Sequence, residues 1–233
     1  MYDKVPTGCG ILDKILEGGI PSESVSLIYG EAETGKTTLS MQCAANCALQ
    51  GYKTLFIDCD GTFTSRRLSQ IASGRVKEAA ELIILMKPSN FREQTIVMER
   101  LADYVTKNFR LIVIDTITSL YSAEVAELPN KTFGLNRELN RQMALLAQMA
   151  KMRKLAIIVT SQVRSAFNEA YVSIEPVATR ILKFWSDIII AMRPTEHSGV
   201  IKAVLEKNPK RSPPVTCYLR IEEKGISEHL IRR

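Results

Sequence analysis

Continuous apolar runs alternate with helix-like segments between residues 24 and 163, and this pattern limits the possible folds of the chain more than any other feature. Strands with one solvated face alternate polar and apolar residues, whereas continuous apolar runs are typical of strands covered on both faces. We therefore expect an α/β fold in which a mostly parallel sheet is flanked by helices. The runs cover residues 24–30, 53–60, 81–88, 109–116 and 155–163.

The pattern changes after residue 162, where shorter apolar segments follow one another through tight turns. We expect these segments to be antiparallel strands that extend one edge of the same sheet. His197 then lies in a hairpin turn at 196–199, as a surface residue rather than a catalyst. The segments cover residues 185–194, 199–209 and 216–226.

Length and composition narrow the class of protein. A chain of 233 residues can bury one sizeable core, so we expect a single domain spanning residues 1–233. No apolar run reaches the length of a membrane span, and the N-terminus does not resemble a signal peptide. The five cysteines are odd in number and form no CxxC pair, which indicates a reducing cytosol, so we expect a cytoplasmic protein. Because no apolar run is long enough, we expect no membrane partner. The net charge of +6 permits a polyanionic partner without establishing one.

The stretch GEAETGKTT, residues 30–38, separates the first apolar run from a helix-like segment and fits the pattern G-x-x-x-x-G-K-[ST]. In such a loop, backbone N–H groups converge on phosphate oxygens at the start of the helix. The Lys36 ammonium can reach the outer phosphates, and the Thr37 hydroxyl can bind Mg²⁺. We therefore expect ATP and Mg²⁺ here. The loop residues are Gly30, Glu31, Ala32, Glu33, Thr34, Gly35, Lys36, Thr37 and Thr38.

Polar residues end two later apolar runs. The carboxyl ends of parallel strands meet at one edge of the sheet, so Asp115 should lie beside Thr37 and share Mg²⁺ with it, through water. Gln162 ends the next run and should lie near the terminal phosphate. The alternative for Gln162 is a simple role at the end of the strand.

Together these residues resemble the RecA/RadA recombinase ATPases. The likeness begins at residues 7–38, similar to the family's opening TG…LD…LLGGGI…G…T…GE…GKT, and continues through FIDCDGTF, LIVIDTITSLY and IIVTSQV. DCDGTFTSRRL is similar to the recombinase stretch DTEGTF…ERL, which favours a RadA-type over a KaiC-type protein. The resemblance implies a RecA-like P-loop ATPase core.

The chain starts almost directly at this core, so we expect neither an N-terminal helix–hairpin–helix domain nor a Phe-x-x-Ala linker. That short form is most similar to archaeal RadA paralogues. The resemblance implies an accessory role in homologous recombination and DNA repair, with DNA as a partner and the main RadA-type recombinase as a second candidate. The oligomeric state stays open, with a dimer as one alternative.

The resemblance also assigns roles. The glutamate of DTEGTF, which orients or deprotonates the attacking water, is Asp60 here. Arg67 matches an arginine that packs against the adenine, and Gln162 matches a glutamine that senses the terminal phosphate. The candidate catalytic set is therefore Lys36, Asp60 and Gln162. Alternatively, Asp60 only caps the strand end and another acid, such as Glu31, is the base.

The resemblance further implies two central loops, at 122–133 and at 163–180. In the second, Arg164, Phe167 and Arg180 combine basic and aromatic groups, which can bind single strands; the alternative is a mobile surface loop. The proline-flanked stretch 207–214 carries Lys207, Lys210 and Arg211, which we expect to be exposed for contact with DNA or a protein. The alternative is a solvated basic turn.

In recombinases, a proline-containing turn near this position caps the neighbouring protomer's nucleotide, with an acidic residue before the proline. Lys207 and Asn208 stand there instead, which argues against an ordinary filament-type cap.

Asp60 is one methylene shorter than the family's glutamate. This shortening predicts tight nucleotide binding with slow hydrolysis, since misplacement by ~1 Å can cost on the order of a hundredfold in rate. We expect a weak ATPase that uses ATP as a switch; the alternatives are a fully active DNA-dependent ATPase and a KaiC-like signalling ATPase.

Overall fold

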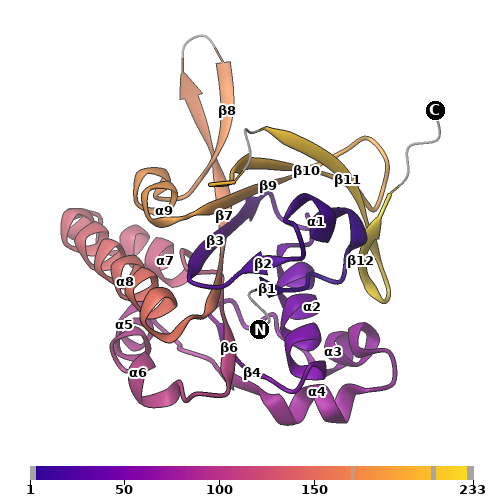
Figure 1. The fold of residues 1–233 in the computed structure, drawn as a ribbon. Coiled ribbons are helices and arrows are strands. Elements are labelled where there is room, and N and C mark those ends of the chain that lie inside the picture. Colours follow the sequence, from indigo (N-terminus) through magenta and orange to yellow (C-terminus); the bar gives the residue numbers. More distant parts are fainter. Residues whose placement is uncertain (1–3, 169–170, 211–213, 230–233) are drawn as a thin grey trace.

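A ten-stranded sheet runs through the molecule in the order β12-β11-β10-β9-β3-β7-β6-β4-β5, with β8 paired to β7 beside this path (Figure 1). The computed structural model describes residues 4–168, 171–210 and 214–229. The strands of this sheet are β3 (Ser24–Gly30), β4 (Lys53–Asp58), β5 (Ile83–Met86), β6 (Phe109–Asp115), β7 (Ala156–Asn168), β8 (Tyr171–Pro176), β9 (Ile188–Pro194), β10 (Val200–Lys207), β11 (Val215–Glu222) and β12 (Gly225–Glu228).

The strand directions confirm the mostly parallel sheet with an antiparallel C-terminal edge. Strands β5, β4, β6, β7, β3 and β9 pair in parallel, whereas β9, β10, β11 and β12 pair antiparallel. The register pairs Gly30 with Gln162 and Asp58 with Asp115, so these four residues share one edge, but Gln162 does not end its strand as expected, because β7 continues to Asn168. A separate antiparallel pair is formed by β1 (Lys4–Val5) and β2 (Ile20–Pro21).

Helices cover both faces of the sheet. On one face lie α1 (Gly10–Ile15), α2 (Lys36–Leu49), α3 (Ser65–Ala72) and α4 (Val76–Leu82). The other face carries α5 (Phe91–Glu99), α6 (Leu101–Tyr104), α7 (Ser119–Glu127), the short 3-10 helix η1 (Pro129–Lys131), α8 (Thr132–Arg153) and α9 (Thr179–Trp185). Figure 1 shows the two groups on opposite sides of β3, β7 and β6. No helix in the described ranges is long and apolar enough to cross a membrane.

Two hydrophobic cores form because successive strand residues point to opposite faces. On β3, Ile28 belongs to the core under α2, and its neighbour Leu27 belongs to the core under α8. Ile158 and Ile157 of β7 divide in the same way. Each fully buried side chain of this kind contributes about 1.5–3 kcal/mol relative to exposure. The continuous apolar runs of the sequence therefore arise from burial on both faces.

Both segments expected as central loops are regular structure. Strand β7 continues to Asn168 and pairs antiparallel with β8, so the described residues of the expected loop at 163–180 are two paired strands followed by the start of α9. Pairing satisfies backbone groups that a loop would leave to solvent. The expected loop at 122–133 lies in α7, η1 and the first turn of α8. Tyr121 anchors α7 by stacking edge-on against Phe91 and by donating a hydrogen bond to Asn136 Oδ1 at 2.9 Å.

Candidate nucleotide-binding site

The GEAETGKTT loop links the end of β3 to the start of α2. Gly30 packs so tightly that an added Cβ would lie 2.1 Å from the Met192 carbonyl oxygen. Glu33 and Gly35 have φ angles of 63° and 86°, in the left-handed region. Such turns aim consecutive N–H groups into one concavity, and the N-terminus of α2 adds its own unpaired N–H groups. The backbone therefore forms a cradle suited to an anion.

Lys36 begins α2, and its side chain is buried against this cradle. The ammonium donates a hydrogen bond to the Glu31 carbonyl at 2.6 Å, and the Thr34 hydroxyl donates to the same oxygen at 2.9 Å. Burial lowers the pKa of Lys36, whereas the nearby carboxylates of Asp115, Asp60 and Glu31 raise it. The loop thus holds a desolvated cation among acidic groups, and a phosphate group would fit this charge arrangement.

Asp115 ends β6 with its side chain fully buried. Its Oδ1 accepts a hydrogen bond from the Thr160 hydroxyl at 2.5 Å, but its buried Oδ2 has no hydrogen-bond partner in the described part of the chain. Burial raises the pKa of Asp115, the hydroxyls of Thr160 and Thr37 lower it, and the carboxylates of Asp60 and Asp58 raise it. An unpaired carboxylate oxygen near a threonine hydroxyl and further acids suits the oxygen coordination of Mg²⁺.

A turn after β4 brings Asp60 to the same place. Asp58 is buried and organises this turn: its carboxylate accepts from the backbone N–H groups of Thr62 at 3.0 Å and Phe63 at 3.1 Å. The Lys87 ammonium lies 3.4 Å from Asp58 Oδ2. Asp60 is half-buried and close enough to influence the pKa of both Lys36 and Asp115. The register of β4 and β6 thus brings the candidate acid to the phosphate loop.

Asp58 was not among the residues predicted from the sequence. Its signal was present in the sequence, as a carboxylate at a strand end followed by the turn residues Asp60 and Gly61. Aspartate side chains commonly accept hydrogen bonds from backbone N–H groups a few residues ahead, which fixes such turns. Thr160, which orients Asp115 from the neighbouring strand, was not among the predicted residues either.

Gln162 lies on β7 directly beside Gly30 of β3. Its carbonyl accepts hydrogen bonds from the Val177 N–H at 3.0 Å and from the Ser161 hydroxyl at 2.9 Å. Gln162 therefore stands at the base of the β7–β8 hairpin and at the edge of the phosphate loop. Its side chain is exposed.

Arg67 on α3 joins the phosphate-loop helix to the β11–β12 hairpin. Its guanidinium donates to the carbonyls of Glu222 at 2.9 Å and Glu223 at 2.8 Å, and one nitrogen lies 3.5 Å from the Thr38 hydroxyl. Arg67 therefore reaches the nucleotide loop, where the resemblance places an adenine contact. In this structure its partners are the two backbone carbonyls, the Thr38 hydroxyl and the Gln70 side-chain oxygen at 3.2 Å.

Gln42 makes a second connection between α2 and the hairpin, one that the sequence reasoning did not foresee. Its amide donates to the Ile226 carbonyl at 3.1 Å and accepts from the Ile226 N–H at 2.6 Å. The sequence signal for this connection was Gln42 itself, a polar residue between Met41 and Cys43, which are both buried. The side chains of Ile221 and Ile226 also approach the loop, since an added Cβ on Gly35 would lie 3.1 Å from each.

The expected DNA-contact residues do not gather at one place. Arg180 is exposed on α9; Arg164 and Phe167 lie on β7, with side chains outside the described part, and Arg211 is outside the described residues. Lys207 is exposed, as expected, and its ammonium donates a hydrogen bond to the Ser186 carbonyl at 2.6 Å. That bond forms because β10 runs antiparallel to β9 and returns Lys207 to the turn before β9.

Lys210 is exposed and lines a pocket of about 210 Å³ together with Ser24 and Asp187. This pocket lies at the amino end of β3. The seven residues of β3 separate it from the phosphate loop by roughly 20 Å. The basic turn and the nucleotide loop therefore occupy opposite edges of the sheet within one chain.

A family model described as Rad51 matches residues 3–229. The chain belongs to the Rad51 family. Two of its relatives are proteins named DNA repair and recombination protein RadB. The one from Thermococcus kodakarensis is 35% identical over 225 residues, covering 95% of this chain and 98% of the relative. The one from Methanococcus maripaludis strain C5 is 32% identical over 216 residues, covering 93% and 96%.

A solved structure described as the crystal structure of the RadB recombinase superposes with a TM-score of 0.84. It is 34% identical and covers 97% of this chain and 100% of that one. The expected likeness to recombinase ATPases and to a short archaeal RadA paralogue is therefore confirmed. Rad51-family membership brings nucleotide use, typically with Mg²⁺, and links the chain to DNA repair and recombination.

Proposed function

We propose that this Rad51-family chain is an ATP-binding accessory protein of DNA recombination and repair that hydrolyses ATP slowly and uses the bound nucleotide as a switch. One observation carries the proposal: a complete phosphate loop, with Lys36 and Asp115 in place, stands beside Asp60, an acid one methylene shorter than the recombinase glutamate. DNA is the proposed partner, with a RadA-type main recombinase as the second.

Binding follows from the loop geometry. The N–H groups between Gly30 and Thr38 would donate to phosphate oxygens, and Lys36 would exchange the Glu31 carbonyl for an outer phosphate. Replacing a neutral acceptor by an anionic one strengthens that hydrogen bond. Thr37 and Asp115 would hold Mg²⁺, which supplies charge neutralisation at the phosphates. The unpaired Oδ2 of Asp115 supports this role because a cation would satisfy it.

Slow hydrolysis follows from the position of Asp60. Asp60 would orient a water toward the terminal phosphate, but its carboxylate is withdrawn by one C–C bond. Asp58 holds the backbone of this turn through two N–H groups, so the turn cannot easily move forward to compensate. Misplacement by ~1 Å can lower a rate by on the order of a hundredfold. Tight binding with slow turnover suits a switch better than a motor.

Phosphate release at steady state, with and without single-stranded DNA, tests this proposal. We expect slow turnover in the wild type, a roughly 10- to 100-fold gain in Asp60→Glu and loss of activity in Asp60→Asn. Glu31→Gln should leave turnover unchanged. A loss of turnover in this variant would instead identify Glu31 as the base. Brisk wild-type turnover, or no gain in Asp60→Glu, would count against the proposal and favour a fully active DNA-dependent ATPase.

Gln162 is proposed as the link between nucleotide and DNA, because it lies beside Gly30 and at the base of the β7–β8 hairpin. DNA affinity should then differ between the ATP-bound and nucleotide-free protein, and Gln162→Ala should abolish the difference without abolishing ATP binding. Titrations over a salt series measure both effects. A shallow salt slope would mean few phosphate contacts and would favour a protein partner.

A further inference from the structure

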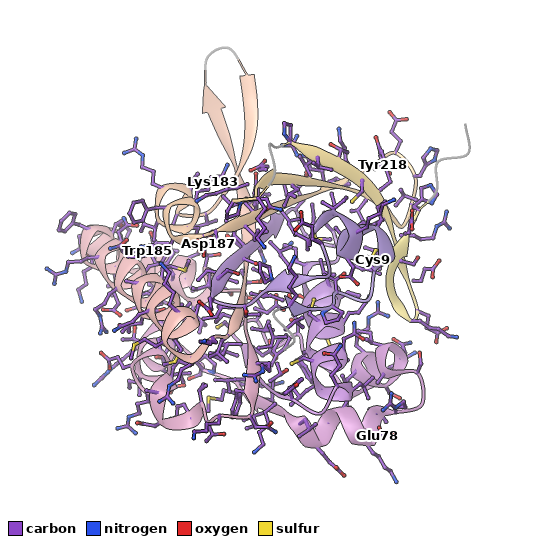
Figure 2. The ribbon with its side chains drawn as sticks, in the orientation of Figure 1. Cys9, Glu78, Lys183, Trp185, Asp187 and Tyr218 are labelled. Carbon is purple, nitrogen blue, oxygen red and sulfur yellow. The ribbon has the colours of Figure 1, made fainter. Side chains whose placement is uncertain are left out.

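The antiparallel strands β10, β11 and β12 are here called the wing. The outer face of the wing carries a hollow that the nucleotide site does not use. The inner face of the wing is apolar, since Ile201, Ala203, Cys217 and Leu219 pack in the core shared with α1. The alternate residues Lys202 and Tyr218 point to the other face. Figure 2 shows Tyr218 on the outer part of the wing, away from Cys9 at the start of α1.

This hollow is an open pocket of about 440 Å³ with Lys202 and Tyr218 in its wall. Both histidines of the chain, His197 from the β9–β10 turn and His229 after β12, line it too. Lys202 and Tyr218 are direct cross-strand neighbours, and the His229 N–H donates to the Tyr218 carbonyl at 3.0 Å. The pocket therefore combines one aromatic ring with an ammonium and two imidazoles.

Cations extend beyond the pocket on the same face. Arg220 is exposed two residues after Tyr218, and Arg193 is the cross-strand neighbour of Lys202 on β9. Glu196 is the one carboxylate in the pocket wall, and Glu222 is exposed two residues after Arg220. Glu206 accepts from the Lys183 ammonium at 3.3 Å and lies 3.9 Å from the Arg193 guanidinium, so Arg193 is paired and Lys202 and Arg220 are the cations that could meet phosphates.

We propose that the outer face of the wing binds single-stranded DNA, with a base stacked on Tyr218 and phosphates held by Lys202 and Arg220. The Tyr218 ring, with Lys202 on the neighbouring strand and Arg220 two residues further on, matches both requirements of a single strand, a stacking surface and positive charge beside it. Duplex DNA fits less well, because its bases are already stacked and unavailable to Tyr218. This inference rests on the proposed DNA binding of the chain, but it assigns that binding to a surface separate from Gln162 and the 207–210 turn.

Fluorescence anisotropy with a labelled oligothymidylate and a duplex of equal length tests the inference at constant nucleotide. Tyr218→Ala should weaken single-strand binding roughly 5- to 100-fold, and Tyr218→Phe should retain it. Lys202→Gln should lower the magnitude of the salt slope by about 0.7. Tyr104→Ala on α6 and Lys151→Gln on α8 are matched controls on the opposite side of the molecule. Duplex binding should change little in Tyr218→Ala.

Three results would overturn this inference, and they are distinguishable. No binding by the wild type would remove the proposed DNA binding and the wing site together. Normal binding in Tyr218→Ala and Lys202→Gln, with loss in Arg180→Ala or Lys210→Ala, would retain DNA binding but place it elsewhere. Equal losses in the control variants would mean a non-specific charge effect. Tyr218→Phe and Lys202→Gln keep the test decisive if Tyr218→Ala fails to fold, which a thermal melt detects.

Discussion

Asp115 illustrates, at the scale of single residues, a conflict between binding and stability. Its carboxylate is buried with one unpaired oxygen, and Asp58 and Asp60 lie near enough to raise its pKa further. A carboxyl whose folded pKa is raised contributes stability below its ordinary pKa and loses it as the pH rises through the folded value. Ionised Asp115 therefore weakens the nucleotide-free fold at neutral pH.

Asp115→Asn should raise the melting temperature of the nucleotide-free protein at neutral pH, because the amide removes the buried charge. The gain should shrink as the pH falls toward the ordinary aspartate pKa of about 3.9, where the wild-type side chain is also neutral. The same variant should bind Mg²⁺-ATP at least about tenfold more weakly, since one ligand is lost. Thermal melts over pH and calorimetric titration measure the two effects. A gain that does not vary with pH would contradict the electrostatic explanation.

Gly30→Ala should destabilise the fold by about 1–3 kcal/mol, because the new Cβ would collide with the Met192 carbonyl and push β3 away from β9. The matched control is Gly134→Ala in α8, where an added Cβ meets no atom within 4 Å. Alanine there should stabilise by about 0.5–1 kcal/mol, because glycine is a poor helix former. Urea unfolding of both variants measures this. A Gly30→Ala variant that is as stable as the wild type, or more stable, would contradict the close approach of Gly30 to the Met192 carbonyl.

At the scale of elements, the β11–β12 hairpin is fastened to the nucleotide loop from three directions. Gln42 bonds the Ile226 backbone, Arg67 bonds the carbonyls of the turn, and Ile221 packs close to Gly35. Elements far apart in sequence thus meet at the start of α2. The hairpin supports the loop mechanically and closes the side on which the resemblance places the adenine.

Gln42→Leu should loosen this hairpin. The Ile226 N–H and carbonyl would remain buried without partners, and each unsatisfied group costs about 1–3 kcal/mol. Hydrogen exchange should therefore accelerate in residues 221–229 ahead of the rest of the sheet, with weaker ATP binding. Gln148→Leu, at an exposed site on α8, is the control. Unchanged exchange in the hairpin would mean that Arg67 and Ile221 suffice to hold it.

At the scale of the whole molecule, the two hydrophobic cores share the strands of one sheet. Leu27 and Ile28 are neighbours on β3 yet belong to different cores, so one core cannot unfold without disturbing the other. We propose on this basis that residues 1–233 form one cooperative domain. Calorimetry should give a single transition with equal calorimetric and van't Hoff enthalpies. Two separable transitions would instead divide the antiparallel wing from the parallel sheet.

Local sequence patterns were sufficient for the parallel sheet, the phosphate loop and the placement of Asp115 at a strand end, whereas Gln162 lies inside β7, which continues to Asn168. These features depend on residue spacing along a few neighbouring elements, and the rule that parallel strands end at one edge converts spacing into position. The same local reasoning misjudged residues 122–133 and 163–180. Their helix and hairpin depend on packing and pairing partners that local composition does not identify.

The sequence by itself determined that this chain has a nucleotide loop in a parallel α/β sheet, because the motif and its flanking strand and helix are contiguous. Only the tertiary structure decided what surrounds that loop. The Gln42–Ile226 pair spans 184 residues, and Lys202 meets Tyr218 and both histidines through antiparallel pairing. Such contacts depend on which strands become neighbours, and that choice reflects burial across the whole chain rather than any short pattern.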